Sequence, residues 1–248
     1  MIKDATIVRF YFSGRRVGPI LQKELRRLSS LNCKTKCLDL GCGDGVMIKD
    51  LYGQNLVGKN VELVGLDISK KNIKLCRRRL PDLHFVVGKA ENILFKAKSF
   101  DFIYSWMVIE HIYNPHKMVA ETTRLLKNGG KCYISSIVKR PWAIYFYRNN
   151  GKFVLDPTHV NEFDSEKSFL KLFKTKELRI IDFSSKLRTY SIVELILKVL
   201  IKSKILRSSI ELRDFFVNNK LMNFVKSFLI IPVPGFYQVE VLHEKNTK

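Results

Sequence analysis

The sequence lacks the features of a membrane-spanning or secreted protein. Its 248 residues contain no uninterrupted apolar run of the roughly 18 or more residues that a spanning helix needs. Residues 1–10 include Lys3, Asp4 and Arg9, so they do not form the long apolar segment of a signal peptide. We therefore expect a cytoplasmic protein, either free or peripheral on the inner face of the membrane.

Cysteine is scarce and follows no metal-binding pattern. The chain has five cysteines, at Cys33, Cys37, Cys42, Cys76 and Cys132, an odd number without a pair of Cys-x-x-Cys motifs. Cys33 and Cys37 lie four positions apart, but Cys37 opens an apolar run that should face a core. We expect reduced thiols and no metal site.

Acidic residues are few in comparison with basic ones. Lysine and arginine number 44 against 23 aspartates and glutamates, so the formal net charge is +21. Such a charge attracts polyanions, which makes nucleic acid and an anionic membrane surface candidate partners. The lysines are scattered, however, and a nucleotide bias of the source genome explains the excess equally well. Both interpretations stay open.

Strand and helix patterns alternate along most of the chain after a helical lead-in at residues 1–34. The predicted strands cover residues 37–40, 61–66, 83–87, 100–106, 131–138, 178–183 and 236–242, and helical patterns begin near residues 46, 69, 115 and 164. Such alternation implies right-handed crossovers and a mostly parallel sheet with helices on both faces. The sequence thus predicts an α/β domain over residues 35–248.

Two segments depart from this alternation. Residues 139–163 form a long stretch rich in aromatic side chains, which is typical of a lid or a substrate-binding loop. Residues 190–231 contain two strongly apolar helical patterns and form a helical insertion before the last strand. This insertion has three interpretations: a cap over a substrate site, a homodimer interface, or a surface that rests on an anionic membrane.

A glycine-rich loop follows the first predicted strand and opens a helix. It reads Asp39-Leu-Gly41-Cys42-Gly43-Asp-Gly45, and glycines there let the backbone turn sharply and approach a ligand. Asp67 ends the next strand, where a carboxylate can accept ribose hydroxyls. The dinucleotide fingerprint G-x-G-x-x-G fails because residue 46 is valine. The loop therefore predicts a nucleotide-like ligand that carries no diphosphate.

These segments together resemble the class I, Rossmann-like methyltransferases that use S-adenosylmethionine. Residues 37–45 look like the first motif of that family, and Asp67 looks like its acidic ribose-binding residue. Residues 88–92, 99–112 and 125–130 are similar to three later motifs, in the same order. The resemblance covers about residues 35–185. It implies a seven-stranded sheet with an antiparallel last strand, and S-adenosylmethionine as cofactor.

The resemblance also implies which residues contact the cofactor. They are Asp39, Gly41, Cys42, Gly43, Asp67, Ile68, Ala90, Glu91 and Ser105. One position departs from the family, because Lys89 stands where many relatives have an aspartate that contacts the adenine amine. Glu91 or the backbone at Ala90 can replace that contact.

Candidate catalytic residues occur in two places. Glu110 and His111 follow the fourth predicted strand, and His159 lies in a segment, residues 156–163, that is similar to one in ubiquinone-type O-methyltransferases. A nearby base helps a hydroxyl acceptor to lose its proton. Each histidine also has a purely structural interpretation: His111 can pack against the following helix, and His159 can tie down its loop.

The sequence predicts methyl transfer, most simply to oxygen, on a small-molecule acceptor or one linked to lipid or glycan. Enzymes that methylate base amines usually carry an Asn/Asp-Pro-Pro-aromatic motif after the fourth strand. This chain has Tyr104-Ser-Trp-Met there, so nucleic acid is the weaker candidate. Two alternatives remain: an RNA methyltransferase that uses the basic surface, and a non-catalytic module that binds S-adenosylmethionine.

Overall fold

The computed structural model describes residues 17–143, 147–149, 152–154, 156, 158–191, 196 and 230–247. The chain divides into two units, one of residues 17–187 and 234–248, the other of residues 1–16 and 188–233. The larger unit contains the core and every predicted site residue. Most of the predicted helical insertion at 190–231, and residues 1–16 of the lead-in, lie outside the described residues.

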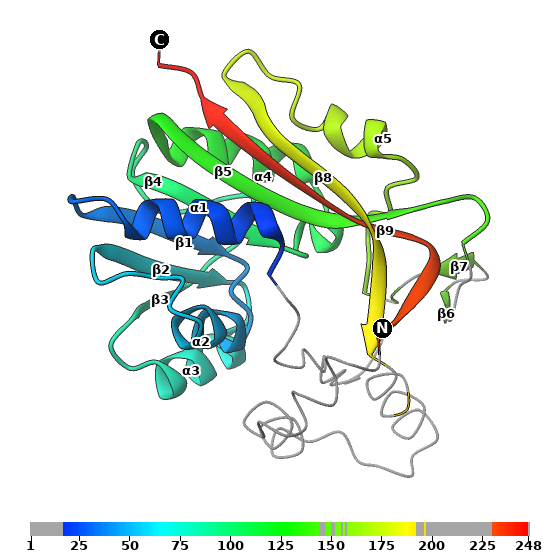
Figure 1. Ribbon diagram of the computed structural model, residues 1–248, viewed down its shortest axis with the longest axis horizontal. Helices are drawn as coiled ribbons and strands as arrows, with labels where there is room; N and C mark the ends of the chain where they lie inside the picture. The colour runs from blue at the N-terminus through cyan, green and yellow to red at the C-terminus, as the bar shows by residue number, and fades with distance from the viewer. Residues whose placement is uncertain are drawn as a thin grey trace. The chain divides into compact units, whose positions relative to one another are not determined.

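A seven-stranded sheet forms the centre of the larger unit (Figure 1). Its strands lie in the order β3-β2-β1-β4-β5-β9-β8. Their bounds are Thr35–Leu40 for β1, Val61–Asp67 for β2, His84–Val87 for β3, Phe100–Trp106 for β4, Leu126–Lys139 for β5, Leu178–Ser191 for β8 and Ile230–Lys245 for β9. The first five are parallel and β9 is antiparallel to β5, which confirms the predicted fold class.

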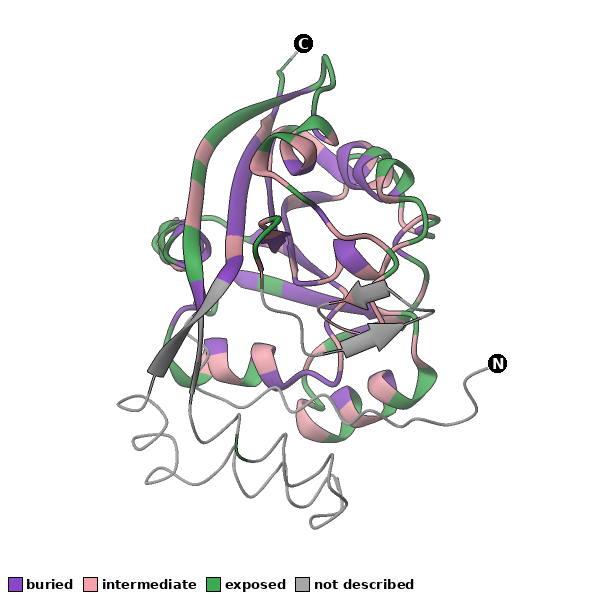
Figure 2. Ribbon diagram, turned by 90° about the vertical axis from the view of Figure 1, so that its right-hand side faces the viewer, coloured by how far each residue is buried: buried purple, intermediate pink, exposed green. Residues whose placement is uncertain are grey.

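Helices cover both faces of the sheet. They are α1 (Pro19–Ser29), α2 (Val46–Gly53), α3 (Lys70–Arg79), α4 (Pro115–Leu125) and α5 (Glu166–Lys171), with a short 3₁₀ helix, η1, at Ile109–His111. Side chains alternate along a strand, so neighbours such as Cys37 and Leu38 belong to two different hydrophobic clusters. The Cys37 cluster includes α1, α2 and α3, whereas the Leu38 cluster includes α4 and α5. Figure 2 shows the central strands mostly buried between these layers.

Local sequence explains where several helices begin. Ser69 accepts a hydrogen bond from the backbone N–H of Asn72 and caps α3, as predicted. Asn114 caps α4 in the same way, and Pro115 occupies its first turn, where no N–H donor is needed. No helix in the described ranges is long and apolar enough to cross a bilayer.

The structure corrects some element bounds. Strand β5 begins at Leu126 rather than Lys131, because Leu126 already pairs with Phe100 before the register shifts. The stretch 139–163 is not wholly irregular: β6 (Tyr147–Asn149) and β7 (Lys152–Val154) pair antiparallel as a separate two-stranded sheet. Aromatic residues in this stretch conceal the alternation that would have predicted the two strands.

The strand order places the ligand-binding edge of the sheet. From β1 the chain adds β2 and β3 on one side and then β4 and β5 on the other. In open α/β sheets, ligands bind beyond the carboxyl ends of the strands at the point where the order reverses. Here that point lies between β1 and β4. The glycine-rich loop after β1 and the segment after β4 are therefore brought to the same edge.

Candidate functional site

The glycine-rich loop has a backbone conformation that requires glycine. Gly41 has a φ of +87°, and a Cβ added there would lie 2.5 Å from a methyl group of Val108, in the segment after β4. Gly43 has a φ of +57°, and nothing lies within 4 Å of a Cβ built on it. Close packing thus joins the loop to the segment after β4, while space remains beside Gly43.

Asp67 connects the loop to the end of β2. One carboxylate oxygen accepts a hydrogen bond from the Gly43 N–H at 3.0 Å. The other accepts from the Ser69 N–H at 2.9 Å and from the Asn72 amide at 3.2 Å. A carboxylate offers about four lone-pair sites, so these three bonds leave one for a ligand hydroxyl. A second ribose hydroxyl would have to displace Asn72 or Gly43. Beside Asp67, the apolar side chain of Ile68 is 64% exposed.

Asp39 is a buried carboxylate at the end of β1. Burial raises its pKa to about 8, and the hydroxyl of Tyr104, which is level with it on β4, offsets part of that rise. Within the described residues, its Oδ2 atom has no hydrogen-bond partner. An unpaired buried charge is costly, and a cation nearby lowers that cost. This end of β1 therefore favours a positively charged ligand.

Other predicted cofactor residues make contacts within the protein. The backbone N–H of Cys42 donates to the Leu66 carbonyl at 3.0 Å, and its thiol is buried. The hydroxyl of Ser105 donates to the Leu40 carbonyl at 2.9 Å, and Glu91 accepts from the Asn114 N–H at 3.0 Å. Ala90 is buried. The cofactor contacts of these residues stay predictions.

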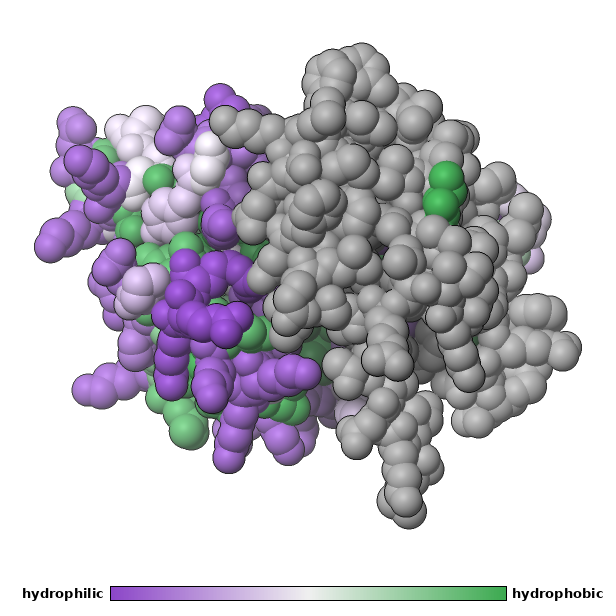
Figure 3. Space-filling view, turned by 90° about the horizontal axis from the view of Figure 1, so that it is seen from below, coloured by the Kyte–Doolittle hydropathy of each residue, from purple (hydrophilic) through white to green (hydrophobic). Residues whose placement is uncertain are grey.

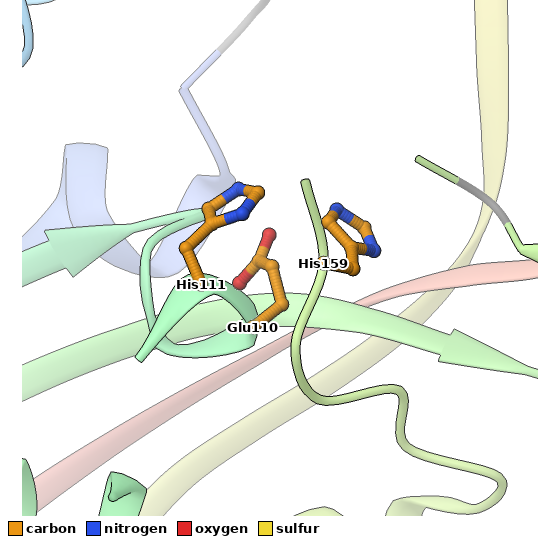
Figure 4. A group of neighbouring side chains, drawn as sticks. All are labelled: Glu110, His111 and His159. Carbon is orange, nitrogen blue, oxygen red and sulfur yellow. The ribbon is translucent and has the colours of Figure 1, made fainter. Parts of the chain in front are cut away.

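The three candidate catalytic residues lie together (Figure 4). Glu110 and His111 come from η1, and His159 comes from the loop that follows the hairpin β6–β7. One polar atom from each residue lies within 4.8 Å of the other two, and the imidazole ring centroids are 4.8 Å apart. Val108, which contacts Gly41, immediately precedes η1 and so places this group next to the glycine-rich loop.

Neighbouring groups hold Glu110 and His111 in place. The Glu110 side chain is buried, and its Oε2 atom accepts a hydrogen bond from the Ser136 hydroxyl on β5 at 3.0 Å. Nδ1 of His111 lies 3.0 Å from the Thr158 carbonyl oxygen. The Thr158 hydroxyl donates to Asp156 at 2.7 Å. A carbonyl oxygen can only accept, so Nδ1 carries the proton and the lone pair of His111 is on Nε2.

The loop that carries His159 is fixed by its backbone. The N–H groups of Val160 and Asn161 both donate to the Glu110 carbonyl at 3.0 Å, and the Asn161 amide donates to the Ile112 carbonyl. These bonds hold the loop on η1, and the catalytic role of His159 stays a prediction.

Sequence reasoning missed two residues that support this group. Ser136 belongs to a pair of serines in an otherwise apolar strand, and that polar pair was the available signal. Thr158 acts through its backbone carbonyl, which no side-chain pattern reveals.

Comparisons with known proteins identify a methyltransferase domain in this chain. A family model described as a methyltransferase domain matches residues 38–134. The ubiquinone biosynthesis O-methyltransferase of Pelagibacter ubique is 27% identical over 155 residues, which are 61% of this chain and 60% of that protein. Phthiotriol/phenolphthiotriol dimycocerosates methyltransferase 1 of Mycobacterium ulcerans is 46% identical over 102 residues, 38% of this chain and 35% of that protein.

A solved structure has the same fold over nearly the whole length. The YcgJ protein of Bacillus subtilis superposes with a TM-score of 0.60 at 18% identity, covering 92% of this chain and 99% of that one. In the comparisons with curated relatives by sequence, the matched region spans between 29% and 70% of the relative's own length.

The fold and the loop define a class I, Rossmann-like methyltransferase. The chain belongs to the family of S-adenosylmethionine-dependent methyltransferases, which confirms the family, enzyme class and cofactor predicted from the sequence. The site fits this cofactor. Asp39 offers a buried carboxylate to a cationic ligand, Asp67 keeps one acceptor site for a ribose hydroxyl, and Gly43 leaves open space beside both.

Proposed function

We propose that this protein methylates a hydroxyl oxygen on a small-molecule or lipid-linked acceptor. The observation that carries the proposal is the convergence of Glu110, His111 and His159 beside the glycine-rich loop. A carboxylate and two imidazoles are the groups expected where an acceptor hydroxyl must be oriented and must lose its proton.

S-adenosylmethionine, when bound, supplies a sulfonium methyl group, whose carbon bonds to the acceptor oxygen while the electrons of the C–S bond pass to sulfur. The protein's task is to align the acceptor and to keep water out, because positioning supplies most of the rate in such a transfer. Hydrogen bonds from Ser136 to Glu110 and from His111 to Thr158 hold two of the three side chains in one orientation. A fixed polar group of this kind can align a hydroxyl oxygen.

Two further observations support this class of acceptor. One relative is named for O-methylation in ubiquinone biosynthesis, and the other is named for a triol and a phenol, both of which carry hydroxyls. In addition, large apolar side chains near the group are exposed: Tyr113 follows η1 and is 86% exposed, and Val160 follows His159. Such surfaces favour an acceptor with a large apolar part.

RNA is the second candidate acceptor, because α3 presents a row of positive charge. Five of its side chains, Lys70, Lys71, Lys74, Arg77 and Arg78, are exposed. Figure 3, which views the molecule from below, shows that the described surface on that side is mostly hydrophilic. Phosphate backbones bind to such surfaces, and so do anionic membranes that contain a lipid acceptor.

The test is methyl incorporation from isotopically labelled S-adenosylmethionine into separated lipid, small-molecule and RNA fractions of a cell extract. We expect label in the lipid or small-molecule fraction, on oxygen, and its loss in Glu110→Gln. The matched control is His116→Asn, at an exposed histidine in the first turn of α4. Label in RNA alone would replace the proposal with the second candidate. Cofactor binding without label in any fraction would instead indicate a non-catalytic module.

A further inference from the structure

The composition of the group beside the loop is also that of a metal site. We propose that Glu110, His111 and His159 bind one divalent transition-metal ion, and that this ion coordinates an oxygen of the acceptor. Binding of the ion by these three side chains does not depend on the proposed function. Coordination of the acceptor by the ion does rest on the proposed function.

The geometry requires little rearrangement. The three ligand atoms lie within 4.8 Å of one another. Nitrogen and oxygen ligands bind zinc at about 2.0–2.2 Å, so two ligands of one ion lie roughly 3.0–3.5 Å apart. Rotation of the side chains about their χ angles can close the difference, and Figure 4 shows the three side chains converging from η1 and the facing loop.

The surroundings of the group are those of metal ligands. A histidine that binds a metal usually donates its second ring N–H to a carbonyl or carboxylate, and a ligating carboxylate is itself hydrogen-bonded. His111 meets the first condition, since Nδ1 lies 3.0 Å from the Thr158 carbonyl oxygen. Glu110 meets the second through the Ser136 hydroxyl.

The ligand types indicate which ions would bind. Two imidazoles and one carboxylate suit zinc, iron, cobalt, nickel or manganese, whereas magnesium and calcium favour sites made of oxygen alone. Three protein ligands leave at least one coordination position open, as in catalytic zinc sites. A cation would also lower the cost of burying the Glu110 carboxylate, which is 2% exposed.

The open position would serve the methyl transfer. A hydroxyl bound to a divalent ion has a lower pKa, so it releases its proton to solvent near neutral pH and remains as an oxygen nucleophile. That oxygen then bonds to the methyl carbon as proposed above. The protein side chains would hold the ion in position, and the ion would orient the acceptor.

The experiment is a titration of the metal-free protein with Co²⁺, followed by its visible d–d absorption, and then displacement by Zn²⁺. We expect one equivalent per chain. His159→Asn and Glu110→Gln should each weaken binding at least tenfold, and Ser136→Ala should weaken it about tenfold, because partners of ligands carry part of the affinity. His116→Asn, on α4, is the matched control and should bind as the wild type does. Circular dichroism would verify that each variant is folded.

Two results would overturn the metal site: no stoichiometric binding, or equal affinity in the wild type, His159→Asn and Glu110→Gln. Methyl transfer measured separately, with chelator and after return of Zn²⁺, distinguishes the two proposals. Transfer that persists without metal would retain the proposed function and refute the role of the ion. Stoichiometric binding without transfer to any fraction would retain the site and refute the proposed function.

Discussion

Asp39→Asn should change how the stability of this protein depends on pH. Burial raises the pKa of Asp39 in the folded chain to about 8, from an ordinary 3.8. Between these values the folded chain keeps a proton that the unfolded chain releases. Raising the pH therefore favours unfolding, so the stability contribution of Asp39 is full below pH 3.8 and is lost as pH rises toward 8.

The size of the effect follows from linkage. Each pH unit inside this window costs the wild type up to about 1.4 kcal/mol of unfolding free energy. From pH 5 to pH 7 the loss is about 2–3 kcal/mol. Asparagine carries no such proton, so the stability of Asp39→Asn relative to the wild type should rise by that amount over the same range.

Urea unfolding at pH 5, 6 and 7, followed by circular dichroism, measures this difference directly. The matched control is Asp82→Asn, which removes an exposed carboxylate from the turn before β3. The difference in unfolding free energy between Asp82→Asn and the wild type should not change with pH in the way that the difference for Asp39→Asn does. If the stability curves of Asp39→Asn and the wild type run parallel from pH 5 to 7, Asp39 does not hold a proton in the folded state and the reasoning is wrong.

Three further outcomes are expected. Burial lowers the pKa of His243 from 6.5 to about 4, so the contribution of His243 to stability is full above pH 6.5 and falls by about 3 kcal/mol as pH drops toward 4. In urea unfolding, the stability of His243→Phe relative to the wild type should therefore rise by that amount between pH 6.5 and 4, and a constant difference would contradict this. Gly41→Ala places a methyl against Val108 at positive φ and should cost about 1–3 kcal/mol, which an unchanged melting temperature would contradict. Asp67→Ala should abolish cofactor binding in calorimetry; unchanged affinity would refute its assignment.

The fold was predictable because its signals are local. Apolar runs that end at glycine or a polar residue mark the strands, and Ser69 marks the start of α3. Right-handed crossovers then imply a mostly parallel sheet with helices on both faces, whereas the order of the strands comes from the tertiary structure. Prediction failed where the pattern was mixed, as in the hairpin β6–β7 and at the early start of β5, where pairing with Phe100 overrides the turn signal of the glycines.

The site was predictable only in parts. Glu110, His111 and His159 could each be singled out as titratable residues near a motif, but nothing in the sequence places His159 against Glu110. The supporting contacts from Ser136 and from the Thr158 carbonyl depend on β5 and on a loop that meet η1 only after folding. An expectation of no metal, drawn from the spacing of the cysteines, could not anticipate a group built from histidine and glutamate.

The sequence by itself determined the fold class and the family, because the glycine-rich loop and Asp67 can be recognised from residue types and their spacing along the chain. Only the tertiary structure decided that Asp39 is buried with a raised pKa, that Asp67 keeps a single acceptor site, and that three titratable side chains converge beside Gly41. These properties depend on desolvation and on distances between residues far apart in the chain. Neither the composition of the chain nor the spacing of its motifs reveals how strongly a group is desolvated or how far apart such residues lie after folding.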